Sequence, residues 1–166
     1  MSSPSLSLLA LLAFVAFIAC DAEATAPPKI YPADWRTTYL EARGCRPSPD
    51  HDLEHVALWI DPASKATWDA CVDAFPEGDG DCEAPFADGA TFVKPQYLDA
   101  ACTQLVRLSI AKKDATRFAS SGGWHWQEVL VDGAGRERVS LDGAVERCSS
   151  CHELCPGHDQ RCYMDP

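Results

Sequence analysis

Short runs of alternating apolar and polar residues recur through the middle of the chain. Such alternation is typical of strands that bury one of their two faces. It predicts strands over residues 56–60, 91–97, 105–111, 124–131 and 138–141. The last two are joined by Asp132-Gly133-Ala134-Gly135, whose residues favour a tight turn. Strands joined by tight turns pair antiparallel, so we expect a mostly antiparallel sheet.

Capping residues predict where helices begin and end. Asp34 can cap a helix that ends at Gly44, and Asp61-Pro62 can begin a second helix that ends near Val72. Residues 73–89 contain several glycines, prolines and acidic residues, which is typical of a long loop. The predicted fold class is α+β, mainly an antiparallel β-sheet with two or three helices, followed by an irregular C-terminal segment.

The N-terminal segment has the pattern of an export signal. Residues 6–19 are apolar and uncharged, which suits a signal-peptide core and falls short of the roughly 20 residues that span a bilayer. Phe17-Ile18-Ala19-Cys20 resembles a bacterial lipobox, in which the cysteine is lipidated. Plain secretion, with cleavage near Cys20, is the alternative. The predicted organisation is a lipoprotein-type signal peptide over 1–19, a linker over 20–33 and one domain over 34–166.

The composition is that of a globular protein with an acidic surface. Of the 166 residues, 46% are hydrophobic and 23% are charged, which is enough to build a core. The net charge of −11 argues against nucleic acid and against an anionic lipid surface as partners. We therefore expect an exported protein, in the periplasm or on the cell envelope, that contacts the membrane only through its lipid anchor.

The segment Cys148-Ser149-Ser150-Cys151-His152 has the spacing of a covalent haem attachment motif. Each thiol can add to one vinyl group of haem, and His152 can then bind the iron as the proximal ligand. We predict one covalent haem c, held by Cys148 and Cys151. The alternatives are a zinc site completed by Cys155 and His158, or a pair of ordinary disulfide cysteines.

The other cysteines suit an exported, disulfide-bonded protein. The chain has nine cysteines, and assigning Cys20 to lipid and two to haem leaves an even number. Six cysteines allow 15 pairings, so the sequence does not determine the connectivity. Short loops favour Cys71 with Cys82 and Cys155 with Cys162, which leaves Cys45 with Cys102 to tie the first helix to a central strand.

The sixth coordination position of the iron is expected to be open or weakly filled. Met164 is the only methionine after the signal peptide, and a Cys155–Cys162 bridge would make its path across the haem awkward. Open haem iron binds small ligands, whereas two strong axial ligands suit electron transfer.

Five segments follow one another in an order and spacing that match a known family. They are residues 56–62, 88–94, 113–119, 123–126 and the C-x-x-C-H motif. Together they resemble the cytochrome P-460 family, which includes the cytochrome c′-beta proteins, over roughly residues 34–166. The resemblance implies a β-rich fold, usually dimeric, with a five-coordinate c-type haem. Some members oxidise hydroxylamine, and others bind nitric oxide or carbon monoxide.

Two further residues are candidates for the haem pocket. In enzyme-type members of the family, a lysine after a matching strand is bonded to a haem meso carbon, and Lys94 lies at the matching place. The alternative is a solvent-exposed strand lysine, because most lysines are exposed. His125, between Trp124 and Trp126, is a candidate distal acid–base group, and a surface or core histidine is the alternative.

Three functions remain open at this point. The first is a c-type monohaem protein that binds small gaseous or nitrogen-oxide ligands and exchanges electrons with an unknown partner. The second is an oxidoreductase that acts on hydroxylamine or nitric oxide, with Lys94 and His125 as catalytic residues. The third is a disulfide-rich zinc or interaction domain without haem.

Overall fold

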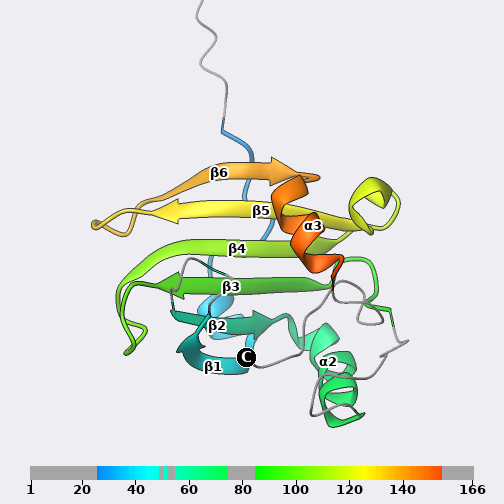
Figure 1. Cartoon of the computed structure of the whole chain (residues 1–166), viewed down its shortest axis with the longest axis horizontal. Coiled ribbons are helices and arrows are strands. Elements are labelled where there is room, and N and C mark those ends of the chain that lie inside the picture. The colour runs from blue at the N-terminus through cyan, green and yellow to red at the C-terminus, as the bar shows by residue number, and fades with distance from the viewer. Residues whose placement is uncertain (1–25, 49–50, 52–54, 75–84, 155–166) are drawn as a thin grey trace, which may run out of the picture.

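The computed structural model describes residues 26–48, 51, 55–74 and 85–154. In this part of the chain, six strands form one antiparallel sheet in the order β1-β2-β3-β4-β5-β6 (Figure 1). The strands are β1 (Leu40–Pro47), β2 (His55–Ile60), β3 (Thr91–Tyr97), β4 (Leu105–Lys113), β5 (Trp124–Val131) and β6 (Glu137–Gly143). The helices are α1 (Trp35–Thr38), α2 (Pro62–Ala74) and α3 (Glu146–His152), and a 3-10 turn spans Ala119–Ser121. The predicted α+β class with a mainly antiparallel sheet is confirmed.

The five predicted strands and the second predicted helix are all present. β3 and β5 have the predicted bounds, and β4 continues two residues beyond the predicted end at residue 111. The side chain of Asp61 accepts the backbone N–H of Ser64 at 3.1 Å, as expected of a residue that caps α2. The same carboxylate accepts the N–H of Thr91 at 2.7 Å, so it also ties the start of α2 to β3.

The first predicted helix is much shorter than expected. α1 ends at Thr38, and the chain then forms β1, a strand that the alternation pattern did not predict. β1 is an edge strand whose residues are exposed or half-buried, and its register with β2 shifts twice. A strand that buries no apolar face has no alternating pattern to recognise.

The C-x-x-C-H motif lies in a helix, whereas the sequence predicted an irregular segment. α3 begins after Val145 and contains all five residues of the motif. A helix of 7 residues is too short to display a repeating apolar face, so its sequence gives no periodic signal.

The sheet is covered on both faces. On one face, Phe92, Trp124 and Trp126 pack with Trp68 of α2, and α3 crosses β4 and β5 on this side (Figure 1). Trp124 and Trp126 therefore share a face, as residues two apart in a strand do. The opposite face packs a second cluster made of Tyr31, Trp35, Val93, Leu108, Ile110 and Val129.

Residues just before α1 belong to the folded domain. The side-chain amide of Gln127 donates to the carbonyl of Pro28 at 2.9 Å. The carboxylate of Glu137 on β6 accepts hydrogen bonds from Lys29 and from the hydroxyl of Tyr31. The packed structure thus includes residues from Pro28 onward, part of the segment that the sequence assigned to a linker over 20–33.

The predicted signal peptide over 1–19 and the lipidated Cys20 lie outside the described residues. Among the residues that the structure does describe, no helix is long and apolar enough to cross a membrane. Export and lipidation therefore stay predictions.

One predicted disulfide is confirmed. Cys45 and Cys102 are bonded, with their Cα atoms 6.0 Å apart. The bridge ties β1 to the connection between β3 and β4, so the expectation that it joins the first helix to a central strand is wrong at both ends. Cys71 is also disulfide-bonded. Its predicted partner and the other predicted pair lie outside the described residues, namely Cys82, Cys155 and Cys162.

Candidate functional site

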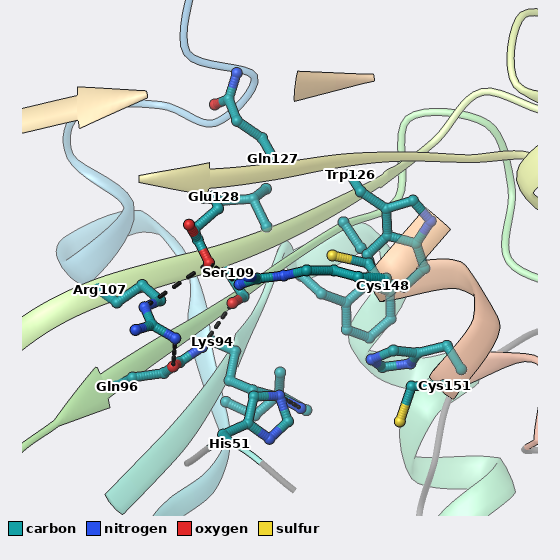
Figure 2. Close-up of a pocket in the computed structure, with 16 residues that line it drawn as sticks. His51, Lys94, Gln96, Arg107, Ser109, Trp126, Gln127, Glu128, Cys148 and Cys151 are labelled. Carbon is teal, nitrogen blue, oxygen red and sulfur yellow. Dashed lines mark hydrogen bonds and ion pairs between the residues drawn. The ribbon is translucent and has the colours of Figure 1, made fainter. Parts of the chain in front are cut away.

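A cavity of about 280 Å³ lies between α3 and the face of the sheet that carries Trp126 (Figure 2). Its floor is made by side chains of β3, β4 and β5, which pair in register and so form rows across the sheet. The rows are Phe92, Ala111 and Trp126 (the apolar row), Lys94, Ser109 and Glu128 (the middle row), and Gln96 and Arg107 (the far row). The floor therefore changes from apolar to polar along the strands.

The C-x-x-C-H motif forms the opposite wall of the cavity. Cys151 and His152 follow Cys148 by three and four residues in α3, so one helical turn brings each of them to the side of the helix that carries Cys148. All three line the cavity. The imidazole ring of His152 lies 4.7 Å from the ring of Trp126, between ring centres. The motif side chains thus lie at the apolar row.

The two motif cysteines are free thiols in different surroundings. Cys148 is half-buried and packs against the core of the sheet, whereas Cys151 is exposed. Burial raises the pKa of the Cys148 thiol, and the neighbouring Arg147 opposes that rise. The alternative that Cys148 and Cys151 are ordinary disulfide cysteines is not what the structure contains.

A buried carboxylate links α3 to the sheet. The side chain of Glu128 on β5 is 10% exposed, and its Oε1 accepts the hydroxyl of Ser140 at 2.6 Å. Its Oε2 pairs with the guanidinium of Arg147, the residue immediately before Cys148. The Nε of Arg107 lies 3.8 Å from the same oxygen. Glu128 therefore holds the motif helix over the cavity from the middle row.

Lys94 lies in the same cavity as the motif. It is half-buried, and its Nζ is 3.4 Å from the Nε2 of His51. The Nδ1 of His51 is in turn 2.9 Å from the hydroxyl of Ser48. This chain of polar groups offers Lys94 a partner that can accept or return a proton. Lys94 is therefore half-buried rather than a solvent-exposed strand lysine.

His125 is not brought to this cavity. Its ring stacks on that of Phe118 at 4.3 Å, and its Nε2 lies 2.8 Å from the Oδ1 of Asp142. It lines a separate cavity of about 540 Å³, together with Lys112 and Arg117. Because successive residues of a strand point to opposite faces, the residue between Trp124 and Trp126 must face away from them. The predicted distal role of His125 thus has no support in this placement.

Several residues of the site were not singled out from the sequence. They are His51, Gln96, Arg107, Ser109, Glu128 and Arg147. Strand alternation carries a signal for Glu128, because it shares a face with Trp126 and an acidic residue there must be buried or paired. His51 and Arg147 reach the cavity only through tertiary folding, so no local pattern reveals them.

The residues present suit a covalently attached haem. Two free thiols and a histidine on one helical turn border a cavity with aromatic walls. Among the residues that the structure describes, no group of three or more His, Cys, Asp and Glu side chains could hold a metal ion. Cys155 and His158, which the zinc alternative requires, lie outside the described part. No known family model and no curated protein matches the chain.

Proposed function

We propose that this protein is a c-type monohaem protein that binds small ligands such as nitric oxide or carbon monoxide. One observation carries the proposal: Cys148, Cys151 and His152 line a single cavity, and both cysteines are free thiols. Each S–H can add across one vinyl group of haem, and the imidazole can bind the iron. The bound haem would supply an iron that can take up a small molecule.

The side chains of the cavity would divide the other tasks. Phe92 and Trp126 present aromatic rings that exclude water from the apolar row. Glu128 keeps α3 against β5 through Arg147. Lys94 can hold a proton at Nζ and exchange it with His51. The cavity thus offers proton-exchanging groups beside an apolar surface.

The resemblance to the cytochrome P-460 family supports the same proposal. The segments that carry it lie in β2 and the start of α2, in the first half of β3, in the connection from β4 to β5, at the start of β5 and in the motif helix α3. We take a ligand binder of the cytochrome c′-beta kind as the leading proposal, because the resemblance implies a five-coordinate haem. An exported, lipid-anchored protein is part of the proposal, since covalent haem attachment suits that compartment.

The test is expression of the full chain together with a haem-attachment system. Denatured protein should keep its haem stain on a gel, ferric protein should have a high-spin spectrum, and ferrous protein should take up carbon monoxide. The stain should be lost when Cys148→Ala is combined with Cys151→Ala. His152→Ala should change the spectrum, whereas His125→Ala, on the opposite face of the sheet, should not. Equal staining of the double cysteine variant would refute the proposal, and a colourless wild-type protein would favour the zinc or interaction domain.

A second candidate function is an oxidoreductase acting on hydroxylamine or nitric oxide. The observation that favours it is the position of Lys94, half-buried in the cavity that also holds the motif. A lysine at this place is where the family's enzyme-type members carry a bond to haem. Hydroxylamine oxidation, if the protein performs it, should therefore depend on Lys94.

Tryptic mass spectrometry can look for the Lys94 peptide joined to the haem peptide. The matched control is Lys112, which lies on β4 but lines the cavity on the other face. Lys94→Ala should abolish hydroxylamine oxidation and Lys112→Ala should not. If the two peptides are separate and Lys94→Ala leaves spectrum and ligand binding unchanged, the enzyme should be rejected in favour of the ligand-binding protein.

A further inference from the structure

The cavity beneath α3 is polar at one end only. The apolar row lies next to His152, whereas the far row of Gln96 and Arg107 lies two rows away along β3 and β4. Residues two apart on a strand are separated by about 7 Å, so the floor spans roughly 13 Å from Phe92 to Gln96. Figure 2 shows Cys148 near Trp126 and Cys151 on the same side of the view, with Arg107 and Gln96 on the opposite side.

The charge of the cavity is opposite in sign to that of the chain. Among the described residues that line it, three side chains are cationic, Lys94, Arg107 and Arg147, and only Glu128 is a carboxylate. The whole chain carries a net charge of −11. An excess of cations in a cavity of an acidic protein favours an anionic group inside it.

Arg107 is the cation farthest from the motif. Its side chain is 23% exposed, its Nη1 lies 3.5 Å from the Oε1 of Gln96, and its Nε lies 3.8 Å from Glu128. Gln96 is itself fixed by donating to the hydroxyl of Ser109 at 2.6 Å. A guanidinium held in place on the cavity floor presents a planar fork of N–H donors, which matches the two oxygens of a carboxylate. Arg147, by contrast, is 64% exposed and lies beside Cys148.

We propose that Arg107, positioned by Gln96, binds a carboxylate of the haem. This inference rests on the proposed function. Haem carries its vinyl groups and its carboxylates on different edges, so thioether bonds at the sulfur end point the carboxylates away from α3. The apolar row then faces the macrocycle, and the far row receives the acidic edge. The polarity of the cavity floor, rather than the motif alone, sets how the prosthetic group lies.

The first test uses the haem-loaded protein and redox titrations at several pH values. A bound guanidinium lowers the pKa of a haem carboxylate, because it stabilises the ionised form. Arg107→Gln should therefore move the pH-dependent region of the midpoint potential to higher pH. Lys112→Gln removes the same charge from the same strand but from the other face of the sheet, and should leave that region in place. Identical pH profiles for the two variants would overturn the proposal.

The second test removes the covalent link. In the variant with Cys148→Ala and Cys151→Ala, ferric haem should bind about tenfold or more tightly than its dimethyl ester, whose carboxylates are blocked. Adding Arg107→Gln should remove most of that ratio by weakening the diacid alone. A ratio near one in the parent variant would overturn the proposal. If that variant does not fold, the redox titrations decide, and a wild-type protein without a haem stain refutes the proposed function itself.

Discussion

Replacing Glu128 should loosen the motif helix from the sheet. The carboxylate is 10% exposed, and each of its oxygens has a partner, with Ser140 on one and the two arginines on the other. Removing the negative charge leaves Arg107 and Arg147 facing each other without compensation. The predicted effect is a lower free energy of unfolding and a more mobile α3.

The magnitude follows from how exposed the partners are. Breaking a buried ion pair costs about 3–5 kcal/mol, whereas an exposed pair contributes about 0–1 kcal/mol. Arg147 is 64% exposed and can turn into water, whereas Arg107 is 23% exposed and cannot do so freely. We expect Glu128→Gln, which keeps an oxygen for Ser140, to cost about 1–2 kcal/mol. Glu128→Ala also leaves a void, so it should cost about 2–3 kcal/mol.

The assay is urea unfolding followed by tryptophan fluorescence, arranged as a double-mutant cycle. Glu128→Gln and Arg147→Gln, alone and combined, should show a coupling energy of about 0.5–1.5 kcal/mol. The matched control is the surface pair of Asp132 and Arg136, where coupling should stay below about 0.5 kcal/mol. If the Glu128 and Arg147 variants are additive, α3 is held by apolar contacts alone and the argument is wrong.

Three further predictions concern the Cys45–Cys102 disulfide, the motif thiols and the carboxylate of Glu137, which binds Lys29 and Tyr31. Replacing Cys45 and Cys102 by alanine should lower the free energy of unfolding by about 2–4 kcal/mol in urea titrations, because the bridge closes a loop of 57 residues. In protein made without haem, iodoacetamide should modify exposed Cys151 before Cys148, whose pKa burial raises; equal rates by mass spectrometry would contradict this. Burial opposes ionisation of Glu137, but hydrogen bonds from Lys29 and Tyr31 outweigh this effect and lower the pKa of Glu137. The stability that ionised Glu137 contributes should therefore be present above the pKa of the unfolded state and be lost as pH falls through the lower pKa of the folded state. In urea titrations, Glu137→Gln should reduce the loss of unfolding free energy at acid pH. An unchanged pH profile would count against this role of Glu137.

The parts of the fold that the sequence could predict are the strands with buried side chains. β2, β3, β4 and β5 contribute side chains to the clusters that cover the sheet, and their positions were predicted to within a few residues. β1 lies at the edge and buries little, so its sequence follows no period. The seven residues of α3 give no period either, although their chemistry was the clearest signal in the chain.

In the candidate site, too, the residues that could be predicted are those recognisable from the local sequence. The C-x-x-C-H motif and Lys94 could be predicted because each is recognised from a short stretch of neighbouring residues. The face of His125 was also encoded, since alternation that places Trp124 and Trp126 together sends His125 to the other side. The prediction that His125 lies in the haem pocket ignored this alternation, and in the structure its ring stacks on Phe118.

The rows across the sheet depend on register, which strand patterns alone do not fix. The connections over residues 98–104 and 114–123 are not tight two-residue turns, so their lengths leave the pairing of β3, β4 and β5 open. A slip of β4 by two residues would keep every face but would place Arg107 beside Lys94 and Ser109 beside Phe92. The middle row would then bring two cations together, and the apolar row would lose Ala111 from under Trp126. The observed register instead puts Ser109 between Lys94 and Glu128 and places Arg107 beside Gln96 in the far row. Register is therefore the step that converts a set of correctly predicted strands into a cavity with one apolar and one cationic end.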